Sequence, residues 1–63
     1  MTMSEFEASH LRAIEENLVD SIRFLVVLGK SKPETNYLYT TCQEHLQTEL
    51  EFVRQLLKRM ESE

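Results

Sequence analysis

Apolar residues recur at helical spacing along two stretches of this chain, separated by a short polar segment. In each stretch the recurring positions advance by three or four residues, which places one apolar stripe on each of two helices. The step order 3-4-4 averages about 3.67 residues per turn and predicts nearly straight helices. The first stripe comprises Leu11, Ile14, Leu18, Ile22, Leu25 and Leu28, and the second comprises Tyr39, Cys42, Leu46, Leu50, Val53 and Leu56.

The first helix has a predicted start and a predicted end. Ser4 and Glu7 have the spacing of a capping box, in which each side chain binds a free backbone N–H of the first turn. Gly29 is the only glycine in the chain. A glycine in the left-handed conformation commonly follows the last helical residue, so we expect the first helix to end at residue 28.

The second helix is predicted to begin beside Pro33, because proline is favoured in the first turn. Ser31 and Glu34 repeat the capping-box spacing, and Thr35 is an alternative N-cap. Short connectors place consecutive helices antiparallel. We therefore predict an all-α fold, an antiparallel two-helix hairpin in a single domain over residues 1–63, with helix 1 at about 4–28, a connector at 29–33 and helix 2 at about 34–61.

The two helices carry more apolar residues than one stripe each requires. Residues 22–28 are apolar almost all round apart from Arg23. A helix that is apolar on every side is buried on every side, and two helices cannot bury every side of each other. A second hairpin is the simplest cover, which predicts a homodimeric four-helix bundle of coiled-coil type with twofold symmetry. The predicted interface with the partner comprises Leu18, Ile22, Phe24, Leu25, Val26, Leu28, Leu46, Leu50, Phe52, Val53 and Leu57.

Length and composition support association and narrow the class of partner. A chain of 63 residues has a marginal core, its single cysteine excludes an internal disulfide, and two histidines and one cysteine offer few metal ligands. Oligomerisation or docking on a larger partner remains as the route to stability. The net charge of −4 disfavours nucleic acid, whose binding depends on neutralising phosphates.

The longest apolar run, Phe24 to Leu28, is far too short to span a membrane. No signal peptide is visible, and a lone thiol suits a reducing compartment, so we expect an intracellular, cytoplasmic protein.

Few residues suggest chemistry. Cys42 and His45 lie three residues apart and would share one helical face, but two ligands are too few for a structural zinc site. Because Cys42 belongs to the apolar stripe, we expect it to pack in the core. Ser21 and Glu49 interrupt the apolar pattern and would set its register. We predict no catalytic residue, metal, cofactor or small-molecule substrate.

Two polar regions are candidates for docking a second protein. The first is an acidic patch on the first helix, which is either a solvated surface or a site for a basic partner. The second is the connector, where two lysines lie close to two tyrosines; such a group can stack on single-stranded nucleic acid, or it can simply cap the end of a bundle. These candidate docking residues are Glu15, Glu16, Asp20, Lys30, Lys32, Tyr37 and Tyr39.

Three functions fit this pattern. The first is a small non-enzymatic protein-binding regulator or adaptor that acts as a homodimer. The alternative is a structural subunit of a larger hetero-oligomeric helical complex. In length and hairpin plan the chain also resembles the plasmid-encoded Rop RNA-binding proteins, and this resemblance implies an RNA-binding dimer as a second alternative. The resemblance aligns no motif, so no RNA-binding residue is transferred from it.

Overall fold

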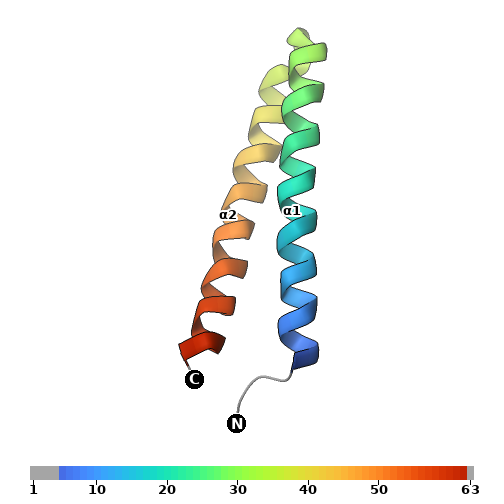
Figure 1. Cartoon of the computed structure of the whole chain (residues 1–63). Helices are drawn as coiled ribbons and strands as arrows, with labels where there is room; N and C mark the ends of the chain where they lie inside the picture. The colour runs from blue at the N-terminus through green and yellow to red at the C-terminus, as the bar shows by residue number, and fades with distance from the viewer. Residues whose placement is uncertain (1–4, 63) are drawn as a thin grey trace.

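The computed structural model describes residues 5–62, with side chains for residues 5–61. Two helices of 27 residues each, α1 (Glu5–Ser31) and α2 (Asn36–Ser62), run antiparallel (Figure 1). Lys32 and a short 3-10 turn, η1 (Pro33–Thr35), join them. The predicted all-α hairpin is therefore confirmed. The predicted capping box at the start of helix 1 involves Ser4, which lies outside the described residues.

Gly29 does not end the first helix, contrary to the prediction. Gly29 has a negative φ, as does every other residue between 5 and 62. The Lys32 N–H donates to the Leu28 carbonyl at 3.0 Å, so helical hydrogen bonding continues past the glycine. Gly29 is buried, and a Cβ at this position would lie 2.5 Å from Asn36 Oδ1 and 3.4 Å from Tyr39 Cβ. Gly29 therefore lies where the two helices approach closely, and it is not a left-handed cap.

The predicted capping box at Ser31 is also wrong. Ser31 is the last residue of α1, and its hydroxyl donates to the Val27 carbonyl at 3.0 Å. The chain leaves the helical conformation at Lys32, with φ −129° and ψ 76°. The proline that follows disfavours the helical conformation at this residue. The Thr35 hydroxyl donates to the Lys32 carbonyl at 3.4 Å. Helix 1 therefore ends three residues later than predicted, and α2 begins two residues later.

The two helices pack along a seam, here called the inner seam, whose residues advance alternately by three and four. It consists of Ala8, Leu11, Glu15, Leu18, Ile22, Leu25 and Gly29 in α1, and of Tyr39, Gln43, Leu46, Leu50, Val53, Leu57 and Met60 in α2. This average spacing of about 3.5 is the coiled-coil pattern and replaces the predicted 3-4-4 stripe. Four residues of the predicted stripe are instead exposed: Ile14, Leu28, Cys42 and Leu56. The close approach at Gly29 accounts for Leu28, because a seam that passes through residue 29 cannot also pass through residue 28.

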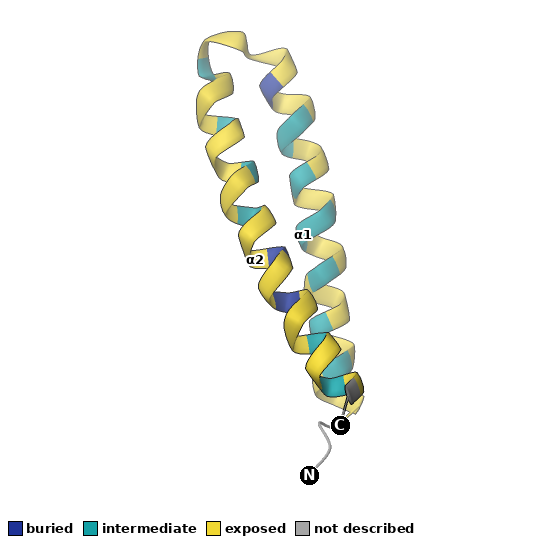
Figure 2. Ribbon diagram, turned by 90° about the vertical axis from the view of Figure 1, so that its left-hand side faces the viewer, coloured by how far each residue is buried: buried dark blue, intermediate teal, exposed yellow. Residues whose placement is uncertain are grey.

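The hairpin is a single layer with very little interior. Leu50 and Val53 are the buried apolar side chains among the described residues. The molecule measures 50 × 15 × 10 Å, and its smallest dimension is close to the diameter of one helix. Covered residues lie along the flanks where the helices face each other, and most other positions are exposed (Figure 2). Since stable domains consist of at least two packed layers, the fold leaves one layer without a cover.

Within residues 5–62, neither helix combines the length and apolar character needed to cross a membrane.

Candidate protein-binding surface

Each helix carries a second row of residues beside the inner seam, and this row also advances alternately by three and four. We call the two rows together the outer seam. It consists of Ile14, Asn17, Ser21, Phe24 and Leu28 in α1, and of Leu38, Cys42, His45, Glu49, Phe52 and Leu56 in α2. Every one of these residues is exposed, so the outer seam is free of contacts that would cover it within the chain.

The two rows lie on the same face of the hairpin. An open groove of about 490 Å³ runs between them, bordered by Ser21, Phe24 and Leu25 of α1 and by Cys42, His45 and Leu46 of α2. Because a single groove contacts both rows, the outer seam forms one continuous surface across both helices. Its lining is mainly aliphatic, aromatic and sulfur-bearing.

Large apolar side chains dominate this surface. The exposed fraction is 68% for Phe24, 59% for Phe52 and 52% for Leu38. Ile14, Leu28 and Leu56 are also exposed over nearly half of their surface. Single exposed apolar residues are ordinary on a monomer, but a contiguous row on each of two adjacent helices marks an interaction surface.

The opposite face is charged and nearly balanced. A second hollow is bordered by Glu15, Glu16, Val19, Asp20, Arg23 and Arg54. The Arg54 Nε–H donates to Glu15 Oε2 at 2.9 Å, which links the two helices, and Arg23 lies 3.9 Å from Asp20. The predicted acidic patch is therefore interleaved with two arginines, which reduces its attraction for a basic partner.

The connector separates the four residues that were predicted to act together. Lys30 and Lys32 are exposed, and Tyr37 is 67% exposed. Tyr39 instead belongs to the inner seam and packs beside Gly29. The two tyrosines therefore do not present a shared stacking surface, which weakens the case for single-stranded nucleic acid.

The residues predicted to contact a partner fall into three groups. Phe24, Leu28 and Phe52 lie on the outer seam. Val26 lies seven residues from Val19, on the charged side of α1. The other predicted residues lie along the inner seam, where they pack between α1 and α2: Leu18, Ile22, Leu25, Leu46, Leu50, Val53 and Leu57.

The predicted interface left out eight of the eleven outer-seam residues, and the 3-4 spacing of the second row was the signal that would have found them. They are Ile14, Asn17, Ser21, Leu38, Cys42, His45, Glu49 and Leu56. Cys42 is exposed, so the prediction that it packs in the core is wrong. It shares the groove with His45, but no group of three or more candidate metal ligands occurs within the described part of the chain.

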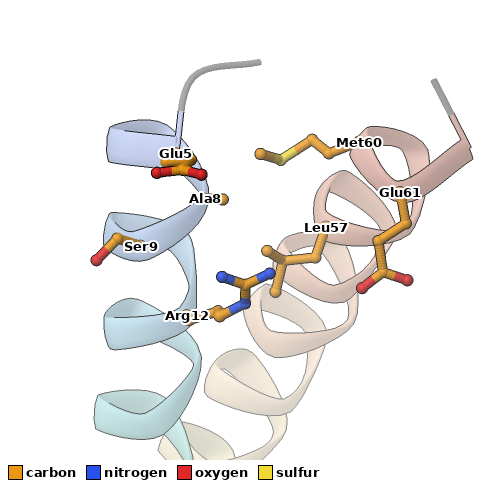
Figure 3. Close-up of a pocket in the computed structure, with 7 residues that line it drawn as sticks. All are labelled: Glu5, Ala8, Ser9, Arg12, Leu57, Met60 and Glu61. Carbon is orange, nitrogen blue, oxygen red and sulfur yellow. The ribbon is translucent and has the colours of Figure 1, made fainter. Parts of the chain in front are cut away.

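A further hollow lies at the open end of the hairpin, between the start of α1 and the end of α2 (Figure 3). Leu57 and Met60 project from α2 toward α1, and Arg12 projects back toward α2. The Ser9 hydroxyl points away from α2. The carboxylates of Glu5 and Glu61 and the guanidinium of Arg12 supply most of the polar lining of this hollow.

Neither a protein-family model nor a curated protein or solved structure matches this chain.

Proposed function

We propose that this chain is a non-enzymatic binding protein that packs its outer seam against the helices of a partner, and that the first partner is a second copy of itself. In a four-helix bundle each helix needs one seam for its neighbour in the same hairpin and another for the opposite hairpin. Both helices here carry two such seams side by side. This pairing of seams is the observation that supports the proposal.

Burial of the outer seam would contribute a free energy comparable to the cost of association. Full burial of a Leu, Ile or Phe side chain contributes about 1.5–3 kcal/mol. Six outer-seam side chains that are about half exposed would contribute roughly 6 kcal/mol for each hairpin, or about 12 kcal/mol for two. Association costs an estimated 4–15 kcal/mol in lost freedom of motion, so the two quantities are of the same size.

Pairing through the outer seam would turn the charged face outward. Glu15, Glu16 and Asp20 would stay accessible there, and Lys30, Lys32 and Tyr37 would stay accessible at the connectors. These surfaces would contact a target protein, as expected of a small regulator or adaptor. The lone thiol of Cys42 is consistent with a reducing, cytoplasmic location.

A structural subunit of a larger helical complex is the second candidate. The observation that favours it is the polar centre of the outer seam, which contains Asn17, Ser21, His45 and Glu49. Polar groups within an apolar seam select a partner that supplies matching groups. A different helical protein that covered the same face would provide them in the same way as a second copy.

Sedimentation equilibrium of matched variants tests the proposal. The wild-type chain of 7.5 kDa should sediment as a helical dimer of about 15 kDa, twice the chain mass. Phe24→Asp should be monomeric, because it buries a charge in the interface. Val27→Asp is the control, since Val27 is 61% exposed but lies outside the outer seam, and this variant should remain dimeric.

Two results would contradict homodimerisation through this face. A wild-type chain that is helical and monomeric at micromolar concentration would favour the hetero-complex. A Phe24→Asp variant that remains at the dimer mass would show that the chain associates through a different surface.

A further inference from the structure

The outer seam of α2 is arranged symmetrically about Gln47, with polar residues next to the centre and apolar residues further out on both sides. Leu38 and Leu56 both lie nine residues from Gln47, and Cys42 and Phe52 both lie five residues from it. His45 and Glu49 both lie two residues from it. Apolar residues thus stand at equal distances from one centre, and the innermost positions carry an imidazole and a carboxylate.

Such a row is complementary to an antiparallel copy of itself. With a twofold axis at the level of Gln47, Leu38 faces the partner's Leu56 and Cys42 faces the partner's Phe52. His45 faces the partner's Glu49, and symmetry repeats this contact on the other side of the axis. An imidazole N–H donates a hydrogen bond to a carboxylate, and polar pairs of this kind determine the orientation and register of packed helices.

The two ends of the row on α1 have their midpoint at the same level. Glu15 lies opposite Arg54, and Gly29 lies opposite Tyr39, so the level of Gln47 corresponds to Ser21 of α1. Ile14 and Leu28 both lie seven residues from Ser21. An axis through Ser21 would therefore place Leu28 against the partner's Ile14. Asn17 and Phe24 lie four and three residues from Ser21 and differ in character, so the support from α1 comes from the two ends of its row.

The other face-to-face arrangement fits less well. If both connectors lay at the same end, α1 would cover the partner's α2, and Glu49 would face the partner's Asn17 and Ser21. Neither side chain carries a positive charge. In this arrangement Glu49 and His45 would no longer face each other, so the polar pairing favours the arrangement with the connectors at opposite ends.

We propose that the second copy docks antiparallel on the outer seam, with α1 on the partner's α1, α2 on the partner's α2, and the two connectors at opposite ends of the bundle. His45 and Glu49 pair across the twofold axis in both symmetry-related positions. This arrangement rests on the proposed function, because it takes the outer seam to be the interface between copies.

The distance between the two connectors tests the arrangement. A nitroxide label at Lys32→Cys, in a Cys42→Ala background, lies eleven residues beyond Ser21, or about 16 Å along the bundle from the axis. Double electron–electron resonance should therefore give a distance of about 35 Å between the two labels. Connectors at the same end of a bundle with helix spacings of about 10 Å would give about 20 Å or less and would overturn the arrangement. A monomeric mass for the wild-type chain would instead overturn the proposed function.

Disulfide formation provides a second test that keeps Cys42 in place. In Phe52→Cys, the introduced thiol should form a disulfide with Cys42 of the partner subunit under mild oxidation. The two positions are about 15 Å apart on one helix, which is too far for a bond within the chain. Glu51→Cys is the matched control, because Glu51 is exposed but lies outside the outer seam. If Phe52→Cys is a dimer but gives no more covalent product than the control, the arrangement is wrong.

Discussion

Replacing Gly29 with alanine separates two reasons for a glycine near the end of α1. In a left-handed cap, alanine would be strained by about 1–2 kcal/mol, because its Cβ approaches the following carbonyl. In the structure Gly29 is helical, and α1 continues to Ser31. Alanine in a helix interior is more stable than glycine by about 0.5–1 kcal/mol, because glycine loses more backbone entropy on folding. The two explanations therefore predict changes of opposite sign.

The space around Gly29 determines how much of this gain is realised. A Cβ at this position would lie 2.5 Å from Asn36 Oδ1 and 3.4 Å from Tyr39 Cβ. The Asn36 side chain is exposed and can rotate its oxygen away, and the distance to Tyr39 is an ordinary van der Waals contact. We expect Gly29→Ala to raise the free energy of unfolding by about 0.5 kcal/mol. This corresponds to an increase in Tm of about 2–4 °C for a domain of this size.

Urea and thermal unfolding of the two proteins would measure the change. Both proteins must be compared at one concentration, because association makes Tm depend on it. The same substitution in an Asn36→Ala background should be at least as favourable, since the obstructing oxygen is absent. A loss of about 1 kcal/mol or more in both backgrounds would refute the helical role of Gly29.

Two further substitutions test the packing of the hairpin. Leu50→Ala removes a side chain that is only 3% exposed and should lower the free energy of unfolding by about 2–5 kcal/mol. Leu56→Ala, at a position that is 47% exposed, should lower it far less at concentrations where the chain is monomeric. Equal losses in urea titrations would contradict the assignment of Leu50, and not Leu56, to the inner seam. Glu15→Gln should lower the free energy of unfolding by about 0.2–1 kcal/mol, a small loss because the ion pair of Glu15 with Arg54 is partly exposed. That difference should shrink between 0.1 and about 1 M salt, and a loss that salt does not change would mean that the charge is not responsible.

The hairpin could be predicted because its signals are local. Helix-forming residues fill both stretches, and Gly29 and Pro33 confine the break to a few positions. The exact ends could not be predicted, because a glycine near a helix end has two roles that look identical in sequence. It can adopt a left-handed conformation, or it can lie in a helix where another chain segment approaches closely. Only the contact of Gly29 with Asn36 and Tyr39 distinguishes them.

The outer seam could be predicted only in part, because its residues alternate with those of the inner seam. Consecutive positions on a helix differ by about 100° in direction, so assigning Leu28 rather than Gly29 to the inner seam moves a side chain to another face. The same choice arises between Leu56 and Leu57. Hydrophobicity favours both members of that pair equally, and the register of the two helices decides between them.

The reactivity of Cys42 tests most directly whether a second copy covers the outer seam. Its thiol is exposed in the single hairpin and lies in the groove between the two rows. The rate of alkylation per chain, followed by mass spectrometry, should fall as the protein concentration rises through the range of dimerisation. In Phe24→Asp the rate should stay high at every concentration. A wild-type dimer whose Cys42 reacts as fast as that of the monomer would show that the second copy does not cover the outer seam.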